Sequence, residues 1–126
     1  MTQTSAIYHP FTGMSGLPFS EVVEVGDLLF LSGQIGINAS GLLIRGGIAA
    51  ETRQTLENIH DVLKRRGSSL DRIVKVTVML ADIGEWAAMN AEYITAFGKQ
   101  LPARSAFGTS GLALGARVEI ECIALR

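Results

Sequence analysis

IVKVTVML, residues 73–80, is the stretch of sequence that decides the fold. β-Branched residues dominate it, and such side chains favour extended backbone because they pack well on the surface of a pleated sheet. We therefore expect a central β-strand at residues 73–80. The segments before and after this strand are expected to form helices that pack against it.

An amphipathic helix is expected just before that strand, over residues 48–66. Basic residues fill its last turn, and Gly67 can adopt the left-handed conformation that ends a helix. The side chains that recur every three or four residues, and so share one helix face, are Ile48, Thr52, Leu56, Ile59 and Leu63.

A second helix is expected just after the strand. Asp82 followed by Glu85 three residues later is typical of a capping box, in which two side chains satisfy the free N–H groups of a first turn. The helix should end near Gly98. It carries an apolar stripe that consists of Trp86, Met89, Tyr93 and Phe97.

The remaining strands are expected at both ends of the chain. Residues 21–25 and 28–32 flank the two-residue turn Gly26-Asp27, which is typical of a β-hairpin. Residues 103–108 and 118–125 also have strand character. The loop 33–47 is rich in glycine and asparagine, and we expect one short strand within it, at residues 42–44.

These elements predict an α+β fold, with a mixed β-sheet and two helices packed on one face. The chain of 126 residues fits a single domain over residues 1–126. Two helices can cover only one side of the sheet, so its other face needs a different cover. Self-association would supply one for so short a chain.

Composition narrows the classes of function. The net charge of −1 provides no basic face, so neither nucleic acid nor an anionic membrane is an expected partner. The longest apolar run, residues 28–31, is far too short to span a bilayer, and residues 1–6 lack the features of a signal peptide. A lone cysteine, Cys122, cannot form an internal disulfide. Together these features predict a cytoplasmic protein.

Common catalytic motifs are missing from the sequence. His9 and His60 are far apart and have no neighbouring ligand motif, so neither a metal site nor a cofactor is expected. Gly46-Gly47 could form an anion-binding nest, although a hinge is the favoured interpretation. Cys122 alternates with apolar residues of a strand, which favours a buried, inert thiol over a nucleophile.

Four polar residues are the remaining candidates for chemistry. Arg104 lies within a strand-like run and is either a surface residue or a guanidinium fixed for a carboxylate. Glu119 and Glu121 share one strand face, where they are either solvated or include one proton-transfer group that faces a pocket. Asn90 interrupts the apolar stripe of the second helix, where it either caps a loop or lines a site.

A set of short segments adds a different kind of information, because they occur together in one order along the chain. They are PFS (18–20), VGDL (25–28), SGQI (32–35), TRQTLEN (52–58), VKVTV (74–78), MN (89–90), PARS (102–105) and VEIE (118–121). From about residue 16 onward, this ordered set resembles the RidA/YjgF family of imine and enamine deaminases, also known as L-PSP endoribonucleases.

The resemblance implies a chorismate-mutase-like, or YjgF-like, fold assembled as a homotrimer with clefts between subunits. It also implies that Arg104 binds the substrate carboxylate and that Glu119 orients or activates water, whereas Glu121 has no such role. The residues it places in the substrate site are Arg104, Asn90, Phe19, Ser32, Gly33 and Ala106. The sequence departs from the family archetype at Phe19, where a tyrosine is usual, and at Ala106, where a cysteine is frequent.

The activity implied by the resemblance is hydrolysis of 2-iminobutanoate and 2-iminopropanoate to 2-keto acids and ammonia, with neither a cofactor nor a metal. A related deaminase that acts on 2-aminomuconate or 3-aminoacrylate is an alternative, as is a non-catalytic trimer that binds keto acids. The nuclease activity in the older family name is disfavoured, because the chain lacks a basic groove and a catalytic histidine pair.

Overall fold

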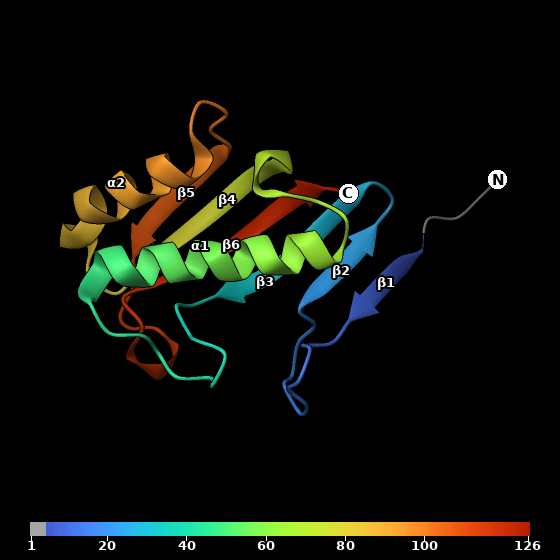
Figure 1. Cartoon of the computed structure of the whole chain (residues 1–126), viewed down its shortest axis with the longest axis horizontal. Helices are drawn as coiled ribbons and strands as arrows, with labels where there is room; N and C mark the ends of the chain where they lie inside the picture. The colour runs from blue at the N-terminus through green and yellow to red at the C-terminus, as the bar shows by residue number, and fades with distance from the viewer. Residues whose placement is uncertain (1–4) are drawn as a thin grey trace.

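A six-stranded mixed sheet with two helices across one face forms the protein (Figure 1). The computed structural model describes residues 5–126. The strand order is β1-β2-β3-β6-β4-β5, in which only β4 and β5 run parallel to each other. This arrangement confirms the predicted α+β class. The elements are β1 (Ala6–His9), β2 (Val22–Val25), β3 (Leu28–Gln34), α1 (Gly47–Arg65), β4 (Ile73–Leu80), α2 (Trp86–Phe97), β5 (Ala103–Gly108) and β6 (Val118–Leu125).

The hydrophobic core lies between the sheet and the two helices. Val76 and Val78 of β4 pair with Cys122 and Ile120 of β6, and all four side chains are buried beneath the helices. In Figure 1 both helices cross the same side of the sheet. The stripe of α1 is buried as its periodicity predicted, and so are Met89, Tyr93 and Phe97 of α2.

The end of α1 follows its predicted stop signal. Gly67 has a φ of 75°, in the left-handed region where a side chain would be strained. Its N–H donates to the carbonyl of Lys64 at 3.1 Å, and the N–H of Ser68 donates to that of Leu63 at 2.9 Å. These two bonds define a Schellman motif, which satisfies the last carbonyls of the helix.

One strand was missed from the sequence, and another that was predicted does not form. β1 was not expected, because Ala6–His9 is a short, exposed edge strand without an apolar alternation. Its pairing with β2 is supplemented by a contact of 3.0 Å between His9 Nε2 and Glu24 Oε1. The short strand expected at residues 42–44 is reduced to a single bridge between Ile37 and Leu43.

The predicted capping box at the start of α2 was also wrong. Asp82 does act as a cap, since its Oδ1 accepts the N–H of Gly84 at 2.8 Å, but it caps the 3-10 turn Ile83–Glu85. The helix α2 itself begins at Trp86. The carboxylate of Glu85 is directed to Arg117 instead.

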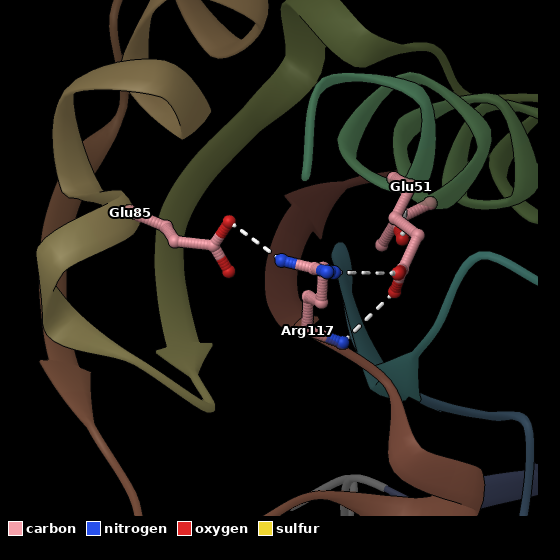
Figure 2. A network of polar contacts seen from close by, with 4 residues as sticks. Glu51, Glu85 and Arg117 are labelled. Carbon is pink, nitrogen blue, oxygen red and sulfur yellow. Dashed lines mark hydrogen bonds and ion pairs between the residues drawn. The ribbon is translucent and has the colours of Figure 1, made fainter. Parts of the chain in front are cut away.

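Arg117 joins the beginnings of three elements, as Figure 2 shows. Its backbone N–H donates to Glu51 Oε1 at 2.8 Å, and its Nη1 donates to Glu85 Oε2 at 2.9 Å. Glu51 lies in the first turns of α1 and is buried, Glu85 precedes α2, and Arg117 precedes β6. The network therefore ties both helices to the central antiparallel strand.

No helix or strand of residues 5–126 covers the sheet face opposite the helices, as predicted from the number of helices. Facing pairs place Val23, Phe30 and Ile123 in one row across β2, β3 and β6. A second row joins Glu119, Met79 and Phe107 across β6, β4 and β5. Phe30 is 40% exposed and Phe107 is 46% exposed, so the open face presents large apolar side chains to solvent.

We predict that Glu51→Ala lowers the free energy of unfolding by about 2 kcal/mol, because it leaves the N–H of Arg117 without its buried acceptor. Arg117→Ala should cost less, about 1 kcal/mol or below, because it keeps this N–H and removes a half-exposed guanidinium. Urea unfolding of both variants measures the two losses. Equal losses would contradict a dominant role for the bond to the backbone.

Candidate functional site

The guanidinium of Arg104 is fixed between β5 and α2. Arg104 pairs with Val76, so its side chain emerges on the helix-covered face of the sheet, where it is half-buried. Its Nη1 donates to Asn90 Oδ1 at 2.7 Å. Its Cζ lies 5.2 Å from the ring centroid of Trp86 and 4.7 Å from that of Tyr93, within the range of cation–π attraction.

The charge of this guanidinium is not neutralised by the surrounding protein. Within residues 5–126, no carboxylate oxygen lies within 4.0 Å of Arg104, and Asn90, which accepts its hydrogen bond, is neutral. A half-buried cation without a counter-ion is a suitable site for an anionic ligand. The arginines that do pair with a glutamate are Arg53, Arg65, Arg117 and Arg126.

These contacts bear on the alternatives left open by the sequence. Arg104 lies on the edge strand β5, where it is half-buried and bonded to Asn90; that it is held for a carboxylate stays a prediction. Asn90 contacts Arg104 and caps no loop among the described residues. Ala106 follows on the same face of β5 and packs against the core, so only its backbone and methyl group are near this position.

Glu119 lies on the opposite, open face of the sheet, where it faces Met79 of β4. Its carboxyl group lies against Gly33 of β3. A Cβ at position 33 would come within 2.1 Å of Glu119 Oε2, so only glycine leaves room for the carboxyl group in this position. Among residues 5–126, no hydrogen bond or ion pair engages the carboxyl group, which leaves it available to a ligand or water.

The pKa of Glu119 is raised above its usual range. Burial is the larger cause, because it disfavours the charged form, and the nearby Glu121 adds like-charge repulsion. Glu121 is itself exposed. A carboxyl group with a raised pKa can take up and return a proton closer to neutral pH than an ordinary glutamate can.

Ser32 and Gly33 form an irregularity in β3 next to Glu119. The register of β3 with β6 shifts between Leu31 and Gln34, as expected for a β-bulge. Ser32 Oγ donates to the carbonyl of Ser20 at 2.5 Å, which brings the preceding Phe19 to the same end of the sheet. Phe19 is half-exposed and makes an edge contact with Phe11, with ring centroids 5.4 Å apart.

One chain does not bring the predicted site residues together. Arg104 and Asn90 form the arginine cluster with the rings of Trp86 and Tyr93, which were not predicted, whereas Glu119, Ser32 and Gly33 form the glutamate cluster. Ala106 lies on the face of the arginine cluster, and Phe19 precedes Ser20, which accepts the hydrogen bond of Ser32. Arg104 shares its sheet face with Val76, whereas Glu119 shares the other face with Met79. Three surface hollows of about 280 Å³ each are lined by other residues.

Trp86 and Tyr93 are two candidate site residues that the sequence analysis missed. Both were assigned to the apolar stripe of α2, which is correct for Tyr93 but wrong for Trp86, whose side chain is 40% exposed beside Arg104. Asn90 was the feature of the sequence that could have identified them, because it interrupts the apolar stripe four residues after Trp86 and three before Tyr93. At this spacing the Asn90 amide and both rings lie on one face of the helix.

Cys122 and the acidic and histidine side chains add no further candidate site among the described residues. Cys122 is buried, and burial raises the pKa of its thiol to about 12, so it is the inert thiol that the sequence indicated. Residues 5–126 contain no group of three His, Cys, Asp or Glu side chains that could hold a metal ion. Neither helix in this part of the chain is long and apolar enough to cross a membrane.

Comparison with known proteins identifies relatives along most of the chain. Residues 14–126 match the model of the endoribonuclease L-PSP family. The 2-iminobutanoate/2-iminopropanoate deaminase of Mus musculus is 41% identical over 110 residues, which cover 86% of this chain and 82% of that protein.

Solved structures show the same fold. YyfA of Yersinia pestis, from the conserved Rid family, superimposes with a TM-score of 0.89 at 35% identity and covers 97% of this chain and all of that one. RidA of the Antarctic bacterium Psychrobacter sp. PAMC 21119 gives 0.83 at 31% identity and covers 94% of each chain. Arg104, which has no carboxylate partner within residues 5–126, and Glu119, which lies against Gly33, are both in the matched region. The chain belongs to the RidA/YjgF family, also known as the L-PSP endoribonuclease family.

Proposed function

We propose that this protein is an enzyme that hydrolyses 2-imino acids, such as 2-iminobutanoate and 2-iminopropanoate, to 2-keto acids and ammonia. The observation that carries the proposal is the fixed guanidinium of Arg104, whose charge no carboxylate of residues 5–126 neutralises. A 2-imino acid has the matching feature, a carboxylate next to the reactive carbon. Relatives that are about 40% identical and bear the name of this deaminase support the choice of reaction.

Arg104 binds and orients the substrate in this mechanism. Of its five N–H groups, one donates to Asn90, and two others can bind both oxygens of a carboxylate. This binding withdraws electron density from the neighbouring C=N carbon and holds it in one orientation. Phe19 and Ala106 supply apolar walls, and the Ser32–Gly33 segment lines the cleft beside Glu119.

Glu119 supplies proton transfer. The imine reacts in its N-protonated form. The Glu119 carboxylate takes a proton from a water molecule as the water oxygen bonds to the C=N carbon, and the C=N electron pair moves to nitrogen to give an amino group. The carboxyl group then gives that proton to the amino group, ammonia leaves as the hydroxyl oxygen forms the carbonyl bond, and the hydroxyl proton passes to the Glu119 carboxylate and from there to solvent. General acid–base help of this kind contributes about 10²–10⁴-fold, which is a useful factor for an imine that already hydrolyses in water.

The complete site needs a second copy of the chain in this proposal. The arginine and glutamate clusters lie on opposite faces of one sheet, so Arg104 of one subunit would face Glu119 of the next. The open apolar sheet face supplies the surface for such an assembly. A cyclic homotrimer repeats this head-to-tail contact three times and closes without leaving an unused surface.

We predict that Arg104→Ala lowers kcat/KM for 2-iminobutanoate by about 10²–10³-fold, because a charge-assisted carboxylate contact is lost. Arg104→Lys should restore only part of the activity, since an ammonium cannot reproduce the bidentate contact. A coupled assay that generates the imine in situ, with semicarbazide as the competing trap, measures the rates. Arg53→Ala, which removes an exposed arginine of α1, serves as the control. Wild-type protein that binds 2-ketobutyrate but leaves the imine half-life unchanged would instead indicate a keto-acid-binding protein.

We further predict that two inactive variants complement each other when their subunits are mixed. In random hybrids of Arg104→Ala with Glu119→Gln, about a quarter of the sites would receive both intact residues if neighbouring subunits share each site. The variants are unfolded together, refolded and assayed, and each variant treated alone is the control. Hybrids that native mass spectrometry detects but that show no gain in activity would contradict the shared site.

The pH dependence tests Glu119 as the proton-transfer group. A base is active only when deprotonated, so activity should fall as the pH drops through the raised pKa of Glu119. Glu121→Gln removes the like charge that contributes to this shift, and the acidic limb of the kcat/KM profile should move to lower pH. Rates are corrected for uncatalysed hydrolysis, and Glu57→Gln on α1 is the control. A limb that stays in place or moves to higher pH would exclude this assignment.

A further inference from the structure

One face of α2 carries a slot that receives the guanidinium of Arg104. Trp86, Asn90 and Tyr93 are spaced four and three residues apart, so their side chains project from the same helix face. At 1.5 Å per residue, the two aromatic residues lie about 10.5 Å apart along the axis, with Asn90 between them. Because Asn90 accepts a bond from the guanidinium and both rings lie within 5.2 Å of it, Arg104 occupies the space between the rings.

The inner ring of the slot is rigid and neutral. Tyr93 is 3% exposed, and its ring packs against Phe97 with centroids 4.5 Å apart. Its hydroxyl is buried without a hydrogen-bond partner among the described residues. Burial raises the pKa of the phenol, so Tyr93 contributes an aromatic face to Arg104 and does not contribute a negative charge.

The outer ring is half-exposed. Trp86 stands at the first residue of α2, and its 40% exposure places part of the indole at the surface beside the guanidinium. Trp86 is not among the buried residues of the helix, which are Met89, Tyr93 and Phe97. The indole instead lies beside Arg104, whose Cζ is 5.2 Å from its ring centroid.

We propose that Trp86 and Tyr93 are positioning residues that select how the substrate approaches Arg104. This inference rests on the proposed function and adds the geometry of recognition. Both rings lie within cation–π distance of Cζ and occupy space beside the cation, and Nη1 is bonded to Asn90, so in this proposal the ligand meets the remaining N–H groups, which lie in one plane. Coplanar N–H groups suit a ligand with two coplanar acceptor oxygens, namely a carboxylate, better than a flat ring such as a nucleobase, which would have to stack on the cation.

The chain contains a single tryptophan, which makes the slot directly observable. Titration of wild-type protein with 2-ketobutyrate should change the fluorescence of Trp86 saturably, because the anion binds at the guanidinium that the indole contacts. Arg104→Ala should abolish this change while the protein stays folded. A tryptophan signal that does not move as 2-ketobutyrate binds, with binding followed by calorimetry, would overturn the inference.

Substitutions at position 86 separate positioning from folding. Trp86→Leu should raise the Kd for 2-ketobutyrate and the KM for the imine by about 3- to 10-fold, since one cation–π contact is lost, with a smaller change in kcat. Trp86→Phe keeps an aromatic face and should restore both constants to within about 2-fold. Ile94→Ala trims another exposed apolar side chain of α2 and is the control for stability.

The outcomes separate this inference from the proposed function. An unchanged Kd in Trp86→Leu, or a Trp86→Phe variant as weak as Trp86→Leu, would overturn the positioning role and leave the deaminase proposal intact. A wild-type protein that binds no 2-keto acid and accelerates no imine hydrolysis would overturn both.

Discussion

Alternation of side chains along β4 and β6 is the constraint on which the rest of this structure depends. Successive residues point to opposite faces, so Val76 and Val78 enter the core while Thr77 and Met79 face outward. The two helices cover only the first of these faces. The same alternation places Arg104 and Glu119 on different sides of one sheet, and it leaves apolar side chains on the face that the helices do not cover.

Two charged residues, Glu51 and Arg104, differ in whether a group of opposite charge pairs with them. Glu51 is buried and fully engaged, since both of its carboxylate oxygens interact with Arg117, and it fixes the position of α1 relative to β6 (Figure 2). Arg104 is contacted by neutral groups, and no carboxylate of residues 5–126 pairs with it. The first arrangement ties elements of the fold together, whereas the second lacks an ion pair, which is the feature on which the proposed binding of a carboxylate rests.

A missing side chain defines the position of Glu119. Gly33 lies in a β-bulge, and the space that its Cβ would fill is taken by the carboxyl group of Glu119. The carboxyl group is thereby recessed enough for burial to raise its pKa, yet it retains no protein partner within residues 5–126. Glycine within a strand often marks a bulge or a close approach, and here Gly33 leaves room for the carboxyl group of Glu119.

The sequence by itself determined the elements whose signals are local and repeated. The β-branched run 73–80, the helical stripe from Ile48 to Leu63 and the cap at Gly67 each have a period or a conformation that few alternatives satisfy. The family resemblance also pointed to Arg104, Glu119, Asn90 and Gly33 as site residues, although it could not place them relative to one another. Only the tertiary structure decided the rest. β1 pairs with the edge of β2, and Glu85 accepts a hydrogen bond from Arg117 instead of capping α2. Trp86 lies beside the guanidinium of Arg104 and not in the core. Each of these depends on a partner distant in sequence, and a periodic pattern contains no information about such partners.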